Sequence, residues 1–409
     1  MKSFILKIIF RSLLVLLPSL EVAAQQTVTP VDSTLQDRLD VIEKKLAYKK
    51  TGEEHIMIVG LTTFGFVSNK TTTTFNGVKT ISKTNSLADA NHYEFSPMFL
   101  WRHGNNLLLE FEPSFSNGQV GINWADVSYF LTPGVIVRAG YLVLPFGIYN
   151  KRLAAGWINK LAIDPIGVSS LPPLTDYGVE VEGGIQAGNM KFNYDVALSN
   201  GLQLLPDGTL QTAGITDNNK NKNFTGRIGW LPFSNSCLEL GFSIMNGKVG
   251  DMDSKYQNTN GLMHAFDFNF IKNLKVFQIN IKGQYNVLNI NRAFYVNPTD
   301  STLSYSFTNH TTSGFIQASA RPMFAENKIV KNFELAGRYG NLITPLNSIG
   351  GSKTNEFAVG LDYWLNWRTV LKFTYQNVNN TNTGGKDLGA STGALIKSNS
   401  MYLQFSVQL

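Results

Sequence analysis

The chain has 409 residues, of which 43% are hydrophobic, 12% are aromatic and only 16% are charged. The many aromatic residues exclude an intrinsically disordered chain, and the low charge is typical of a protein with an apolar exterior and a polar interior. Cys237 is the single cysteine, which excludes a disulfide framework, and the formal net charge of +6 is too small to indicate a nucleic-acid partner.

Residues 1–24 have the pattern of a secretory signal peptide, in which basic residues precede a short apolar stretch and small residues allow cleavage. The pattern consists of Lys2, Lys7 and Arg11, the apolar stretch 12–20, and the small residues 22–24. A buried N-terminal helix is the alternative, but the apolar stretch is too short and its flank too basic. The sequence therefore predicts export. The exported chain keeps a net charge of +4, because the peptide removes three basic residues and one acidic residue.

The exported chain begins with a segment, residues 25–54, in which we expect one amphipathic helix over residues 31–47. The apolar seam of this helix consists of Leu35, Leu39, Ile42 and Leu46. Because a helix this short is marginal alone, we expect it to pack against copies of itself in an oligomer or against the rim of the main domain. A solvated spacer is the alternative.

From residue 55 to residue 409 the hydrophobic pattern alternates with a period of two, which is typical of β-strands. In residues 93–101, for example, the odd positions are apolar or aromatic and share one face. The segments are long enough to cross a bilayer as tilted strands of about 9 to 11 residues. Sixteen such segments begin near Ile56, Tyr93, Leu107, Gly121, Val135, Gly178, Lys191, Asn223, Cys237, Gly261, Leu274, Ser313, Lys331, Asn355, Thr369 and Ser398.

The connections between these segments alternate between long and short. The long ones are residues 69–90, 142–177, 200–222, 246–260, 289–312, 341–354 and 379–397, with 116–119 as a brief exception. All of them except 142–177 are rich in Asn, Thr, Ser and Gly. A soluble β-sandwich has similar loops at both ends, whereas outer-membrane barrels have short periplasmic turns and long external loops. The sequence therefore predicts an all-β fold, a transmembrane antiparallel β-barrel of about sixteen strands over residues 55–409, with both chain termini in the periplasm.

Tryptophans near the short turns predict an aromatic girdle at the periplasmic membrane interface. These residues are Trp101, Trp230, Trp364 and Trp367.

Several motifs, in order along the chain, resemble the phosphate-selective porin O and P family. They are residues 138–147 (RAGYLVLPFG), 176–179 (DYGV), 197–201 (ALSNG), 226–233 (GRIGWLPF), 333–339 (FELAGRY) and 360–366 (GLDYWLN). The resemblance implies a sixteen-stranded, homotrimeric porin in the outer membrane of a Gram-negative bacterium.

The longest connection, residues 142–177, is apolar and Pro-rich, unlike the other long connections. In a barrel too wide for side chains to fill, we expect this segment to fold inward and to pack on the wall through Phe146, Leu153, Trp157, Leu161 and Ile166. Its basic residues Lys151, Arg152 and Lys160 would then face the opening and add positive charge at a constriction. An external lid with solvated lysines is the alternative.

The inward face of the strands carries eleven acidic and seven basic residues by the alternation, so the wall alone predicts no basic path for anions. Any anion or phosphate preference would depend on the inward segment. The selectivity candidates are Arg102, Arg138, Lys151, Arg152, Lys160, Glu180, Glu182, Arg227 and Arg338.

The sequence shows no catalytic motif: the five histidines lie near segment ends or in loops, without a GxSxG or HExxH pattern. We therefore expect no enzyme, cofactor or metal site, and outer-membrane lipid and small polar or anionic solutes as partners. The function predicted is a passive diffusion channel. The alternative is a closed outer-membrane receptor or adhesin that binds ligands through its long loops.

Overall fold

The structure is a computed structural model that describes residues 54–87, 93–116, 118–153, 158–168, 171, 175–211, 217–291, 293–385 and 391–409. The signal peptide and the helix predicted over residues 31–47 lie outside the described residues. Residues 54–409 form one compact unit. None of the helices in the described part of the chain is long and apolar enough to cross a membrane.

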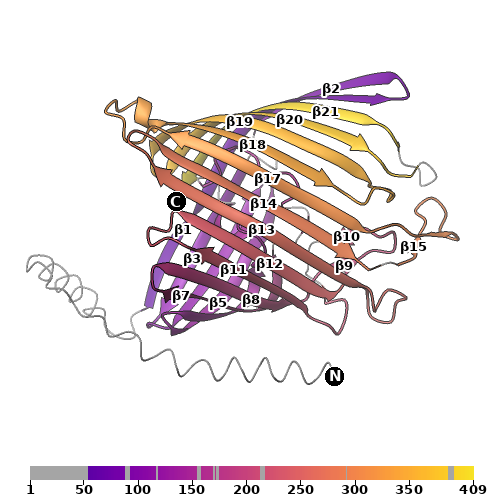
Figure 1. Ribbon diagram of the computed structural model, residues 1–409, viewed down its shortest axis with the longest axis horizontal. Coiled ribbons are helices and arrows are strands. Elements are labelled where there is room, and N and C mark those ends of the chain that lie inside the picture. The colour runs from indigo at the N-terminus through magenta and orange to yellow at the C-terminus, as the bar shows by residue number, and fades with distance from the viewer. Residues whose placement is uncertain are drawn as a thin grey trace, which may run out of the picture. The chain divides into compact units, whose positions relative to one another are not determined.

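The unit is an antiparallel β-barrel whose strands run obliquely side by side (Figure 1). Its strands are β1 (Glu54–Phe75), β2 (Val78–Leu87), β3 (Tyr93–His103), β4 (Leu107–Ser116), β5 (Gln119–Thr132), β6 (Val135–Val143), β7 (Thr175–Ala187), β8 (Met190–Ser199), β11 (Asn223–Leu231), β12 (Leu238–Lys248), β13 (Asn260–Asn273), β14 (Gln278–Ile290), β17 (His310–Arg321), β18 (Phe333–Ile343), β19 (Ser352–Asn366), β20 (Thr369–Asn382) and β21 (Leu395–Gln408). The connections add the short strands β9 (Gln203–Leu204), β10 (Leu210–Gln211), β15 (Tyr295–Val296) and β16 (Ser304–Tyr305), the helix α3 (Tyr149–Arg152) and the 3₁₀ helix η1 (Val330–Asn332).

Strand β1 closes the barrel. One edge of β1 pairs with β21, from Leu61 with Gln408 to Thr74 with Leu395. Its other edge pairs first with β3 and then with β2, so β2 and β3 share one place in the barrel wall. The barrel therefore has sixteen places, and the sixteen-stranded antiparallel barrel predicted from the sequence is confirmed.

The alternation separates an apolar outer surface from a polar inner wall. On β19, for example, Phe357 and Leu361 are outward and 51% and 45% exposed, whereas Glu356 and Asp362 are inward and buried. A membrane-spanning barrel needs this division, because lipid surrounds the outer face while hydrogen bonds between strands satisfy the backbone.

The prediction of a long connection over residues 69–90 is wrong in part. Strand β1 continues to Phe75, and β2 returns beside it after a tight turn at Asn76 and Gly77, both of which have positive φ angles. The resulting hairpin lies beside β21 at the upper right of Figure 1. Strands also extend into the connections predicted at 341–354 and 379–397, which shortens both.

The prediction that Trp364 belongs to an aromatic girdle on the outer surface is wrong. This side chain points into the barrel, is 5% exposed, and donates a hydrogen bond from Nε1 to Glu334 at 2.9 Å. Its even position on β19 places it on the inward face with Asp362. Trp230 and Trp367 are exposed, and Trp101 is half-buried.

The two ends of the barrel differ, and we call them the short-turn end and the long-connection end. Glu54, at the start of β1, and Leu409 lie at the short-turn end, where β7 and β8 join through only Gly188 and Asn189. The inward-folding segment starts from the long-connection end, between β6 and β7.

The closure of the barrel predicts a specific disulfide. Thr63 on β1 and Ser406 on β21 are direct partners that face the interior, so Thr63→Cys and Ser406→Cys in a Cys237→Ser background should form a cross-link on mild oxidation. The cross-linked protein should need a higher temperature to unfold on a gel. Thr63→Cys with Ser128→Cys on β5 is the matched control and should stay reduced; a folded barrel with no Thr63/Ser406 cross-link would contradict the observed register.

Candidate functional site

The described part of residues 142–177 lies against the inner wall of the barrel; we call this part the inward loop. Its apolar residues Phe146, Ile148 and Leu161 are at most 1% exposed. Ile148 and Tyr149 pack with Phe315 of β17, and Leu161 packs with Ala336 and Ala358 of β18 and β19. Trp157 lies outside the described residues.

The first half of the inward loop is fixed to β12 and β14 at Gly147. The Gly147 amide donates to Ser243 Oγ at 3.0 Å, and the next two amides donate to Gln284 Oε1 at 3.0 and 3.1 Å. A Cβ at Gly147 would lie 2.1 Å from Gln284 Nε2, and the backbone there has φ of +67°. Glycine is therefore required for this close approach.

The second half of the inward loop is held by basic side chains of the wall. Arg338 of β18 donates to the carbonyls of Ile163 and Asp164, both at 2.9 Å, and forms a fully buried ion pair with Glu356 at 2.8 Å. Lys372 of β20 donates to the carbonyl of Asn159 at 2.6 Å. These bases satisfy loop carbonyls that water would otherwise have to solvate.

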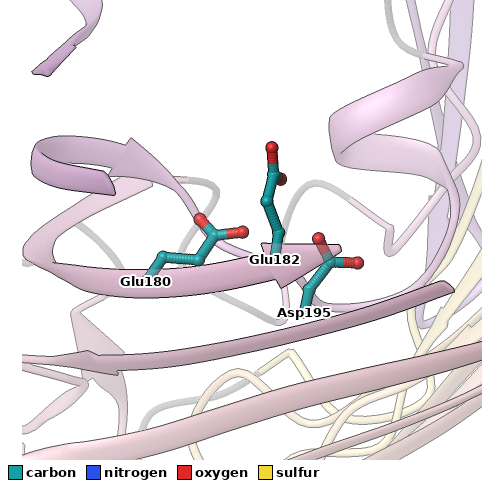
Figure 2. Close-up of side chains that lie close together, drawn as sticks. All are labelled: Glu180, Glu182 and Asp195. Atoms are coloured by element: carbon teal, nitrogen blue, oxygen red, sulfur yellow. The ribbon is translucent and has the colours of Figure 1, made fainter. Parts of the chain in front are cut away.

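Lys151 of α3 lies at the centre of three wall carboxylates. Figure 2 shows Glu180 and Glu182 of β7 and Asp195 of β8 pointing into the same space, with their oxygens within 4.8 Å of one another. Lys151 Nζ donates to Glu180, to Glu182 at 2.9 Å and to Asp195 at 3.2 Å. Burial alone would lower the pKa of Lys151, but the three carboxylates outweigh burial and raise the pKa, so the ammonium group stays charged at neutral pH.

The other two bases predicted at the opening are also paired. Arg152 contacts Glu239 at 2.6 Å, and Arg227 of β11 binds the same carboxylate at 3.1 Å and Asp267 at 2.6 Å. Lys160 pairs with Glu334 at 3.2 Å and lies 4.6 Å from the ring centre of Trp364. All three loop bases are therefore neutralised by acidic residues of the wall.

A polar cavity of about 170 Å³ lies between the inward loop and strands β4 to β7. Arg138 borders it and bridges Glu110 at 3.3 Å and Glu182 at 2.9 Å. The complete lining is Glu110, Trp124, Asp126, Arg138, Leu142, Val143, Asn150, Lys151 and Glu180. Carboxylates outnumber bases in this lining by three to two.

The site residues predicted from the sequence lie mostly close together in the structure, but the prediction did not include the residues that fix the inward loop to the barrel wall. Arg138, Lys151 and Glu180 line the cavity, and Glu182 pairs with Arg138 and Lys151. Arg102, in contrast, is exposed beside a short turn, where it donates to the carbonyl of Asn105. Gly147, Ser243 and Gln284 were not singled out. The first lies within the motif at residues 138–147, but nothing in the sequence pairs it with β12 and β14.

The long connections form a second apolar cluster. Leu204, Val249, Tyr256, Tyr295 and Phe307 come from three connections and are buried together with residues of the inward loop, including Phe146. The Tyr256 hydroxyl donates to the carbonyl of Phe294 at 2.9 Å. These connections are therefore packed against each other on the side of the barrel formed by β8 to β17.

No protein-family model and no curated protein matches the sequence of this chain, so the resemblance to the porin O and P family stays a prediction. Solved structures do resemble the fold. The outer membrane channel DcaP of Acinetobacter baumannii is 14% identical and has a TM-score of 0.54, with 88% of this chain and 99% of that one covered. An anion-selective porin from Comamonas acidovorans is 14% identical, with a TM-score of 0.51 and coverage of 87% and 100%. OmpF of Salmonella typhi is 10% identical, with a TM-score of 0.50 and coverage of 85% and 97%. At these low identities the likeness shows a shared barrel fold.

Proposed function

We propose that this protein is an outer-membrane porin, a passive diffusion channel for small hydrophilic solutes, with the long-connection end outside the cell. The observation that carries this proposal is the polar cavity between the inward loop and β4 to β7, inside a closed barrel with an apolar exterior. The similarity of the fold to a channel and two porins supports it. The periplasmic location of both termini and the predicted homotrimer belong to the same proposal.

We further propose that the channel does not prefer anions. The anion preference predicted from the sequence depended on free charges at Lys151, Arg152 and Lys160, and each of these side chains pairs with a wall carboxylate. The cavity lining has an excess of carboxylates, so a weak preference for cations follows. The porin of similar fold from Comamonas acidovorans is anion-selective, but we propose no such selectivity for this chain.

Recording from planar bilayers tests the channel directly. Purified protein should insert as discrete conductance steps, and a salt gradient should give a reversal potential on the cation-selective side. Heat-denatured protein from the same preparation is the control. Folded protein that inserts without conductance would contradict the proposal.

The packing of the long connections favours one second candidate, a closed receptor. The buried cluster around Tyr295 gives these connections a fixed shape, which suits ligand binding at the barrel mouth. A receptor should leave the bilayer electrically silent while the protein remains folded, so the same recording separates the two functions. Native mass spectrometry in mild detergent tests the trimer independently of either.

A further inference from the structure

A repeated arrangement of three residues occurs on the outer face of four strands at the long-connection end. An exposed apolar residue is followed two positions further toward that end by Ser or Asn, and after two more positions by Lys. The four sets are Phe66, Ser68 and Lys70 on β1; Leu87, Asn85 and Lys83 on β2; Met401, Asn399 and Lys397 on β21; and Phe357, Asn355 and Lys353 on β19. The four lysines, which we call the lysine collar, are all exposed.

The register places the collar on one continuous strip of the barrel. Strands β2, β1, β21, β20 and β19 are consecutive neighbours, and β20 has Asn379 beside Lys397 where the others have Lys. Four strand spacings of about 4.8 Å make the strip about 19 Å wide. This width suits the headgroup of a lipid that carries more than one phosphate.

The height of the collar matches the polar region of a bilayer. Each lysine is four residues beyond an apolar side chain of 36% to 68% exposure, which is about 13 Å along a strand and about 10 Å along the normal of the membrane for a tilt of about 40°. Lysine side chains are long and can turn back toward headgroups. On β1, β19 and β21 the collar therefore borders the apolar band from its polar side, whereas on β2 the exposed Ile81 follows Lys83.

No ion pair joins a collar lysine to an acidic side chain among the described residues. Lys70 and Lys83 are direct partners across β1 and β2, where like charges repel one another. No acidic residue occurs at the outward positions of β1, β2, β19, β20 and β21 between the apolar band and the long-connection end, within the described residues. An anion that bridges the two lysines would relieve this repulsion.

We propose that the lysine collar binds the phosphate groups of an anionic lipid in the membrane leaflet at the long-connection end. The inference depends on the barrel spanning a membrane and not on its conductance, so failure of the channel proposal would leave it standing. The Ser and Asn side chains between the apolar band and the collar add hydrogen-bond donors to the same headgroup.

The test is native mass spectrometry of the full barrel in detergent, titrated with diphosphorylated lipid A. Replacing all four collar lysines by Gln should weaken binding by about tenfold or more, because the change removes four positive charges that attract the lipid phosphates. The control variant changes four exposed lysines elsewhere, Lys220, Lys255, Lys275 and Lys328, to Gln, and should bind within twofold of wild type. Changing the collar to Arg should preserve binding.

Four results would overturn the proposal. Equal losses in the collar and control variants would mean that only total charge matters, and unchanged binding in the collar variant would remove the site. Equal binding of a phosphate-free glycolipid would reject phosphate as the ligand, and binding of inorganic phosphate as tight as that of lipid A would assign the collar to free phosphate instead of a lipid. Folding of each variant is checked by its heat-dependent shift on a gel.

Discussion

Replacing Arg338 by Leu is expected to cost about 3–5 kcal/mol of folding free energy, the largest effect of any single change considered, because Glu356 would stay buried without its partner. Both side chains of this ion pair are fully buried. The change also removes two hydrogen bonds to the carbonyls of Ile163 and Asp164, so the inward loop should come loose. Urea unfolding in detergent, followed by tryptophan fluorescence, measures the cost.

Two variants separate the buried charge from other effects. Arg338→Leu combined with Glu356→Gln should recover part of the loss, because no unpaired charge remains. Arg321→Leu on β17 is the matched arginine control; Arg321 donates to the carbonyl of Lys331 and forms no ion pair among the described residues, so the cost should be smaller. Equal destabilisation by both single changes would show that the ion pair with Glu356 is unimportant.

The Lys151→Glu variant is expected to shift the channel strongly toward cations. The change reverses two units of charge beside the polar cavity and places a fourth carboxylate among Glu180, Glu182 and Asp195. At about 8 Å in water, two units of charge lower the energy of a monovalent cation and raise that of an anion by about 1 kcal/mol each, so the cation-to-anion permeability ratio should rise roughly thirtyfold. Repulsion should also detach α3 from the wall and make the current noisier.

Reversal potentials at low and high salt measure this shift, which should be larger at low salt because ions screen the added charge. Lys220→Glu, on an exposed connection, is the control and should leave selectivity unchanged. An equal shift in both variants would place the ion path outside the inward loop, at the barrel mouth.

The positions of the strands could be predicted because the alternation is imposed by two different solvents, lipid outside and water inside. The hairpin of β1 and β2 was not predicted, because in this part of the chain the two faces of the strand no longer differ in hydrophobicity. Residues 71–74 are four threonines, which favour strands but give no apolar face, so the period of two disappears. The pair Asn76 and Gly77 is a strong hairpin signal that could have located the turn.

The inward loop was predicted from its composition, but its charge state was not. The sequence shows that Lys151 is a basic residue in a largely apolar connection. The carboxylates that pair with it lie 29 to 44 residues away, on β7 and β8. Which wall residue meets which loop residue depends on the register of the strands and on the path of the loop across the barrel. Trp364 is a second example: the sequence correctly placed it near a short turn, but it did not predict that the side chain faces the inside of the barrel.

The pairing of β1 with β21 also determines the order in which the barrel can assemble. Most neighbouring strands are joined by a hairpin and can pair as soon as both exist, but Leu61 and Gln408 are separated by almost the whole described chain. Contacts of such long sequence separation form slowly, because a large loop entropy is lost before any bond is gained. The edges of β1 and β21 would stay open until the final step, exposing unpaired backbone groups that invite aggregation.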